Sequence, residues 1–155
     1  MKLPHLLLAG SFFLMASCGG EKSKSTATES AEPAAEAAPA ASSNDDLSNK
    51  GIGPVTSVSL GEIDQSMVDA GKATYEAYCT ACHKAEEDFI GPAPKGILER
   101  RSPEWVMNMI LNPQEMTAKD PIAKRLLEEA NNVPMIGQGL TEQQAREVLE
   151  YFRTL

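Results

Sequence analysis

The chain of 155 residues is poor in histidine, cysteine and aromatic side chains. It has two histidines, His5 and His83, and three cysteines, Cys18, Cys79 and Cys82. A structural zinc site takes four nitrogen or sulfur ligands. Cys79, Cys82 and His83 supply three, and the sequence has no second pair of cysteines or histidines that would complete such a site.

Positive charge is also scarce, because the chain has 14 basic and 22 acidic side chains and a formal net charge of −8. Proteins that bind nucleic acid need an excess of positive charge to neutralise phosphates, so nucleic acid is excluded as an expected partner. An acidic protein is instead attracted to basic surfaces on other proteins. Glu86, Glu87 and Asp88 form one acidic cluster, which fits either a docking site or an ordinary solvated loop.

The apolar run at the N-terminus, Leu6–Ala16, is too short to span a bilayer and follows Lys2, as in a signal peptide. Small residues then precede Cys18, and this pattern resembles the lipobox of bacterial lipoproteins. The resemblance implies that residues 1–17 are removed and that Cys18 carries lipid, on the periplasmic side of a bacterial membrane. The alternative is an ordinary signal peptide, which would leave Cys18 as a free thiol.

No aromatic residue lies between Phe13 and Tyr75. Residues 18–50 are rich in Ala, Glu, Pro and Ser and cannot bury enough apolar surface to offset the entropy of ordering, so we predict a disordered, flexible, lipid-anchored linker. Residues 51–63 contain apolar side chains between glycines and a proline, which predicts an extended arm that lies against the globular part.

Cys79-Thr80-Ala81-Cys82-His83 is a C-x-x-C-H motif, the attachment site of c-type haem. Two thiols at this spacing near a helix end can each add to a haem vinyl group, and the histidine that follows can bind the iron. A thioredoxin-like C-x-x-C would instead follow a strand of a βαβ unit. The residues before Cys79 do not have a strand pattern. With Cys18 lipidated and Cys79 and Cys82 bound to haem, no cysteine remains for a disulfide.

Residues 64–155 have a helical pattern throughout, which predicts an all-α domain of about four to five helices. We expect a helix from Gln65 to Cys79 with Asp64 or Ser66 as its N-cap. A short helical turn is expected over 94–100. Three more helices are expected to be opened by Ser102-Pro103, by Asp120-Pro121 and by Thr141, the last with Gln144 in a capping box.

The ordered motifs of this domain resemble those of class I c-type cytochromes with one haem. Gly71 and Tyr75 precede the C-x-x-C-H motif, Gly91-Pro92 follows it, Val133-Pro134-Met135 stands before the last helix, and Tyr151 lies in that helix. In the family, the glycine and the first aromatic pack against an aromatic of the C-terminal helix. The resemblance implies the small cytochrome c fold around one haem.

The same resemblance implies a set of site residues. Cys79 and Cys82 would hold one haem c covalently, and His83 would bind its iron. The carbonyl of Pro92 would accept a hydrogen bond from Nδ1–H of His83. Met135 would be the second iron ligand, in the loop that the family uses for this purpose.

The residues alone leave two methionines open as the second ligand. Met67, Met107 and Met109 lie in expected helices and are interpreted as core side chains. Met116 lies after Asn112-Pro113 in an expected loop and competes with Met135, which follows a proline between two helices. A ligand pair of histidine and methionine raises the haem potential relative to harder ligands.

These expectations describe a membrane-tethered electron carrier that is not an enzyme and has no small-molecule substrate. Its partners would be periplasmic redox proteins: a quinol-oxidising complex or another cytochrome as donor, and a terminal oxidase or a reductase as acceptor. The alternative is a five-coordinate haem protein that binds a small gas or reduces peroxide, which requires that Met135 does not bind the iron. A dithiol oxidoreductase without haem is a third possibility.

Overall fold

The computed structural model describes residues 45–155. The expected signal peptide, Cys18 and nearly all of the expected linker lie outside the described residues. Between residues 45 and 155 no helix is both long enough and apolar enough to cross a bilayer.

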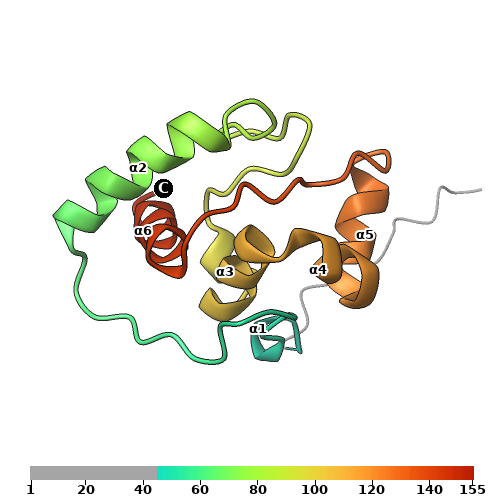
Figure 1. Ribbon diagram of the computed structural model, residues 1–155, viewed down its shortest axis with the longest axis horizontal. Coiled ribbons are helices and arrows are strands. Elements are labelled where there is room, and N and C mark those ends of the chain that lie inside the picture. The colour runs from blue at the N-terminus through green and yellow to red at the C-terminus, as the bar shows by residue number, and fades with distance from the viewer. Residues whose placement is uncertain (1–44) are drawn as a thin grey trace, which may run out of the picture. The chain divides into compact units, whose positions relative to one another are not determined.

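The described part of the chain is built from helices and loops and contains no strand, which confirms the predicted all-α fold. Five of the helices have seven or more residues (Figure 1). In chain order the elements are α1 (Asp45–Ser48), α2 (Gln65–Tyr78), the 3-10 helix η1 (Ile97–Glu99), α3 (Pro103–Leu111), α4 (Pro113–Lys119), α5 (Pro121–Glu129) and α6 (Glu142–Phe152).

The predicted N-caps begin the helices through their own side chains. Asp64 accepts hydrogen bonds from the first turn of α2, Ser102 caps α3 and Asp120 caps α5. Thr141 and Gln144 form the predicted capping box at the start of α6. These contacts satisfy backbone N–H groups that have no partner within the helix, so the local sequence determines where each helix starts.

The segment after Asn112 is helix α4, so the prediction that Met116 lies in a loop is wrong. Pro113 takes the first helical position, where a proline ring fits because no N–H is needed there. Met116 is fully buried, and its sulfur accepts a hydrogen bond of 2.9 Å from the backbone N–H of Ile52. The proline therefore ends one helix and at once opens the next.

Helices α2 and α6 pack directly against each other (Figure 1). At their contact the ring of Tyr75 lies 5.5 Å from that of Tyr151 and 5.6 Å from that of Phe152, between centroids. The aromatic contact predicted for Tyr75 and Tyr151 is therefore present, and Phe152 extends it. Such tilted and edge-to-face pairs stabilise a helix contact beyond the area that they bury.

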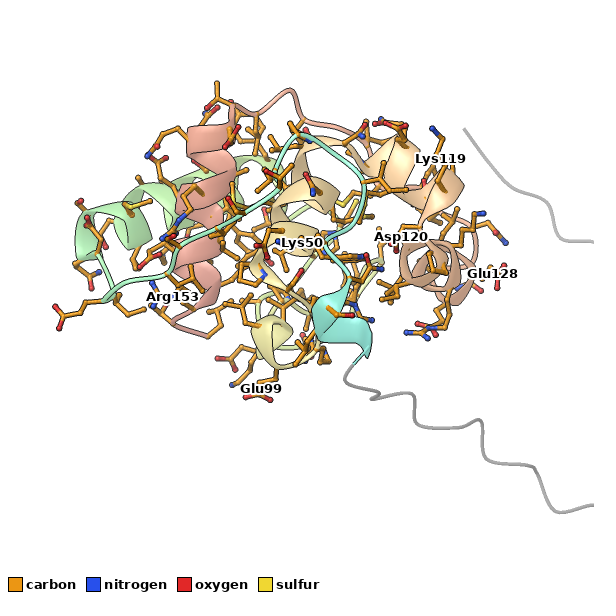
Figure 2. The ribbon with its side chains drawn as sticks, turned by 90° about the horizontal axis from the view of Figure 1, so that it is seen from below. Lys50, Glu99, Lys119, Asp120, Glu128 and Arg153 are labelled. Carbon is orange, nitrogen blue, oxygen red and sulfur yellow. The ribbon has the colours of Figure 1, made fainter. Side chains whose placement is uncertain are left out.

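The segment from Asn49 to Ile63 crosses the domain as an extended arm and contributes to the core (Figure 2). The buried side chain of Asn108 in α3 donates to the carbonyls of Lys50 and Val55, both at 2.9 Å, and accepts from the N–H of Val55 at 3.0 Å. Val55 itself is only 4% exposed and belongs to the hydrophobic core. The arm therefore packs against α3 as part of the folded domain.

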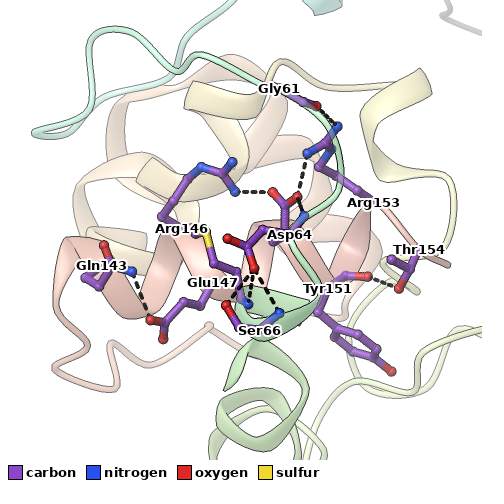
Figure 3. A network of polar contacts seen from close by, with 11 residues as sticks. Gly61, Asp64, Ser66, Gln143, Arg146, Glu147, Tyr151, Arg153 and Thr154 are labelled. Atoms are coloured by element: carbon purple, nitrogen blue, oxygen red, sulfur yellow. Dashed lines mark hydrogen bonds and ion pairs between the residues drawn. The ribbon is translucent and has the colours of Figure 1, made fainter. Parts of the chain in front are cut away.

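The C-terminal end of the arm is held by a buried carboxylate in α6 (Figure 3). Glu150 is fully buried and bonds Arg146 at 2.5 Å, Arg153 at 2.6 Å and the backbone N–H of Asp64 at 3.1 Å. Arg153 also donates to the carbonyl of Gly61 at 2.7 Å. Burial would raise the pKa of the Glu150 carboxyl, but the bonds from Arg153, Arg146 and Asp64 lower it overall, so the group stays charged.

Candidate functional site

A largely apolar pocket lies in the middle of the domain, and every helix from α2 to α6 contributes to its lining. Tyr75, Trp105 and Val148 are buried side chains that form part of its walls. Cys79, Cys82, His83, Pro92 and Met135, the five residues proposed from the sequence, all line it. These five residues, which are up to 56 positions apart in the sequence, are therefore brought to one cavity.

Helix α2 ends at Tyr78, one residue earlier than expected, and Cys79 forms its C-cap. The backbone then turns tightly, because the N–H groups of Cys82 and His83 both bond the carbonyl of Cys79, at 3.1 and 2.9 Å. This turn presents both thiols and the imidazole to the same pocket.

Burial raises the pKa of the Cys79 thiol to about 11, so this thiol stays protonated at neutral pH. A thioredoxin-type exchange reaction depends on a thiolate with a lowered pKa. Burial of Cys79 therefore acts in the opposite direction to the lowered pKa that such a nucleophile needs.

The imidazole of His83 is oriented by a backbone carbonyl. Its Nδ1 lies 2.9 Å from the oxygen of Pro92, and because a carbonyl only accepts, Nδ1–H is the donor. The hydrogen bond that the family resemblance assigned to Pro92 is present. Nε2 is then the nitrogen with a free lone pair, as an iron ligand requires.

Gly91 allows the loop to pass close to His83. A Cβ atom at position 91 would lie 2.3 Å from Cε1 of the imidazole, closer than any side chain tolerates. The N–H of Gly91 bonds the carbonyl of Cys82 at 2.9 Å. Tyr75 also holds the backbone of His83 in place, because its hydroxyl donates a hydrogen bond of 2.9 Å to the carbonyl of His83. Burial raises the pKa of Tyr75 to about 12, which keeps this hydroxyl protonated.

Met135 lies in the segment that joins α5 to α6 and lines the pocket, whereas Met116 does not. The turn at the start of this segment is made by Asn131 and Asn132, which adopt positive φ angles of 54° and 60°. Asparagine tolerates this left-handed conformation better than most residues, so the Asn131-Asn132 pair is a sequence signal for a turn at this point.

Met109 is a pocket residue that the sequence does not predict. Its helical position indicates a core side chain, and in the structure Met109 both lines the pocket from α3 and packs against the edge of the core. The four-residue spacing from Trp105, another lining residue, is the signal that could have placed both on one helix face.

The three residues of the acidic cluster after the motif, Glu86, Glu87 and Asp88, form ion pairs or hydrogen bonds with neighbouring residues. Glu87 pairs with Lys84 at 2.7 Å, and Glu86 pairs with Lys95 at 3.5 Å. Asp88 accepts a hydrogen bond of 2.7 Å from the backbone N–H of Ala93. Each of the three carboxylates thus has a local partner in the loop.

The donor set of the pocket fits a haem group. Two thiols and one imidazole share a single turn, the imidazole has only Nε2 open, and a thioether belongs to the same lining. The remaining walls are mostly apolar, as a porphyrin ring requires of a pocket that encloses it.

Comparison with known proteins gives matches over the same region. The family described as "Cytochrome c" matches residues 68–155. A curated relative from Synechocystis sp., described as cytochrome c-553-like, is 33% identical over an alignment of 61 residues, and the match covers 31% of this chain and 58% of the relative. The matched region thus covers less than two thirds of that relative.

Two solved structures from Rhodothermus marinus are also similar. A cytochrome c is 45% identical, with a TM-score of 0.63, over 66% of this chain and 88% of that chain. An engineered cytochrome c bound to a carbene intermediate is 45% identical, with a TM-score of 0.60, over the same shares. The arrangement of the helices is therefore that of the cytochrome c fold.

Proposed function

The chain belongs to the cytochrome c family, and on that premise we propose that it is a membrane-tethered monohaem c-type cytochrome that carries single electrons between periplasmic redox proteins. Members of this family bind one haem c covalently, and Cys79 and Cys82 fit the attachment motif. In this proposal the chain is an electron carrier and not an enzyme.

The observation that carries the proposal is the hydrogen bond between Nδ1 of His83 and the oxygen of Pro92, in a pocket that Cys79, Cys82 and Met135 also line. It fixes the tautomer and leaves Nε2 open toward a metal. A purely structural role of His83 would not explain why two thiols on the same turn line the same pocket.

Each site residue has a defined task in this proposal. Cys79 and Cys82 form the two thioether bonds, His83 supplies Nε2 and Met135 supplies its sulfur as ligands. When bound, the haem supplies the iron that changes between Fe(II) and Fe(III). The apolar walls, with Trp105 and Val148, exclude water and so disfavour the additional charge of the oxidised state, which favours a positive potential.

The tether and the partners extend the proposal beyond the domain. Signal-peptide cleavage after residue 17 and lipidation of Cys18 would hold the protein at the periplasmic side of a bacterial membrane. A net charge of −8 favours partners with basic docking surfaces. A quinol-oxidising complex or cytochrome would be the donor, and a terminal oxidase or reductase the acceptor.

Haem attachment gives the decisive experiment. The protein is produced in a host with cytochrome c maturation and analysed by mass spectrometry and absorption spectroscopy. We expect one haem per chain that resists acid-acetone extraction and a low-spin ferric spectrum with the methionine-to-iron charge-transfer band. An extractable haem would refute covalent attachment, and a high-spin spectrum would favour gas binding or peroxide reduction.

A further inference from the structure

One peptide bond connects the imidazole of His83 to a carboxylate. The carbonyl of Pro92 and the N–H of Ala93 belong to the same peptide group. The carbonyl accepts from Nδ1 of His83 at 2.9 Å, and the N–H donates to Oδ1 of Asp88 at 2.7 Å. The result is a continuous chain of two hydrogen bonds from the imidazole through the peptide to a negative charge.

We propose that Asp88 is a positioning residue that tunes the electron-donating strength of His83 through the peptide group between Pro92 and Ala93. The proposal rests on the proposed function, because it takes His83 as the ligand of the haem iron. Asp88 is a charged group that does not contact His83 and would act on the hydrogen bond between His83 and Pro92 through the intervening peptide group.

Polarisation of the peptide gives the physical reason. A hydrogen bond to an ionised carboxylate is stronger than a neutral one, and successive hydrogen bonds strengthen one another by about 10–30% per bond. The charge on Asp88 draws the amide proton of Ala93 and so increases the negative partial charge on the Pro92 oxygen. That oxygen in turn holds Nδ1–H more strongly, which makes Nε2 of His83 a stronger donor. A stronger donor stabilises Fe(III) and lowers the potential.

The loop holds this peptide group from both sides. On one side the N–H of Gly91 bonds the carbonyl of Cys82 at 2.9 Å. On the other side the guanidinium of Arg100 donates to the carbonyls of Ala93 and Lys95, at 3.1 and 3.0 Å. The orientation of the peptide therefore does not depend on Asp88 alone, so removing its charge should change polarisation more than geometry.

The neighbouring carboxylates provide an internal control. Glu87 is one residue away and pairs with Lys84 at 2.7 Å. Glu86 pairs with Lys95 at 3.5 Å, and neither carboxylate bonds the peptide between Pro92 and Ala93. Glu87→Gln therefore shows what the loss of a charge from this loop does through space, whereas a shift of the Nδ1 proton of His83 requires the relay through the peptide and is specific to Asp88.

The test compares the reduction potentials of the haem-loaded wild type, Asp88→Asn and Glu87→Gln at one pH and ionic strength. Asparagine keeps an oxygen that can accept from Ala93 but has no charge. We expect the potential to rise in both variants, with a shift in Asp88→Asn at least about twice that in Glu87→Gln. The proton on Nδ1 of His83 should also move to higher field in the NMR spectrum of Asp88→Asn only.

Asp88→Glu is the conservative variant, because it keeps the charge on a longer side chain. It should retain a potential closer to the wild type than Asp88→Asn does. Equal shifts for Asp88→Asn and Glu87→Gln, with the Nδ1 proton unmoved, would overturn the proposal and leave Asp88 with a structural role only. A wild-type protein without covalent haem would instead refute the proposed function, so the two failures are distinct.

Discussion

Gly71 in α2 lies directly against the backbone of Glu147 in α6, and a Cβ atom at position 71 would be 1.9 Å from the carbonyl oxygen of Glu147. The obstacle is backbone, which cannot rotate away as the end of a side chain could. The contact brings the helices close enough for the ring of Tyr75 to reach Tyr151 and Phe152. Helices α2 and α6 can therefore cross this closely only with a glycine at position 71.

Gly71→Ala should destabilise the domain by roughly 3 kcal/mol or more, at the upper end of what overpacking costs, because the two helices must separate. Chemical denaturation followed by circular dichroism measures the effect. Gly61→Ala is the matched control, since a Cβ atom there meets nothing within 4 Å. Equal stabilities of the two variants would contradict the close crossing.

Met135→Ala and Met116→Ala should separate the two methionines that the sequence left open. Met135 lines the pocket, so its removal should abolish the ferric charge-transfer band, lower the potential and admit imidazole or cyanide. The domain should still fold, because the thioether bonds and His83 retain the haem. Absorption spectra and ligand titrations measure the outcome.

Met116→Ala should leave that spectrum intact but should cost stability. Met116 is fully buried under the arm, and its sulfur accepts from Ile52, so truncation should cost roughly 2–5 kcal/mol. A lost charge-transfer band in Met116→Ala, with Met135→Ala unaffected, would move the ligand assignment to Met116. Loss in neither variant would favour the five-coordinate alternative.

Glu150→Gln should reveal a pH-dependent contribution to stability. The pKa of Glu150 is lowered in the folded protein from an ordinary value of 4.5, so the charged form binds Arg146 and Arg153 more strongly than the protonated form. The unfolding free energy of the variant should be lower by roughly 2–4 kcal/mol at neutral pH, because Arg146 and Arg153 would then bond a neutral amide in place of a carboxylate.

The sign of the pH effect follows from that lowered pKa. The stabilisation by Glu150 is fully present above about pH 4.5, the ordinary glutamate value, and is lost as the pH falls through the lowered native value. Unfolding free energies of the wild type and Glu150→Gln should therefore converge in acid. A difference that stays constant from neutral to acidic pH would contradict the assigned charge state.

Cys18→Ser should release a haem-loaded protein from the membrane fraction, because the residues expected to hold the haem all lie between positions 79 and 135, far along the chain from Cys18. Stable anchoring by lipid takes two or more chains, which a lipoprotein cysteine provides and serine does not. Fractionation and immunoblotting after a high-salt wash measure the release. Retention of Cys18→Ser in the membrane would show that another part of the chain is the anchor.

Local chemistry determined what the sequence could predict. N-caps such as Ser102 and Thr141 act within three residues, and the C-x-x-C-H turn is closed within five, so their structure follows from neighbouring residues. The role of Pro92 depends on a contact only nine positions from His83, and the family resemblance supplied it. The placement of Met135 in the pocket followed the same resemblance.

The failures involve competing local signals or distant contacts. Pro113 fits both a helix end and a helix start, so the sequence around Met116 did not distinguish a loop from the short helix α4. The sequence predicted that the arm lies against the globular part, but it did not indicate which residues hold the arm, because Val55 and Asn108 are 53 positions apart. No local pattern indicates such a pair, because a buried asparagine in a helix is unremarkable until its partners are known.

Asn108→Ala should loosen the arm while leaving the pocket residues in place. The side chain is 1% exposed and makes three hydrogen bonds to the backbone of Lys50 and Val55, so its loss leaves buried backbone groups without partners. We expect a loss of roughly 2–3 kcal/mol in unfolding free energy. We also expect faster proteolysis within residues 50–63, because the arm would open locally before the helices unfold.

Limited proteolysis with mass spectrometry of the fragments measures that opening, and the absorption spectrum shows whether the haem environment is retained. Gln65→Ala is a suitable control, since the amide of Gln65 makes an exposed bond to Asp69 within α2 and should change neither quantity. If Asn108→Ala is cleaved in the arm no faster than the control, the arm is held by Val55 and its other contacts. If both cleavage and the spectrum change together, the arm and the pocket unfold as one cooperative unit.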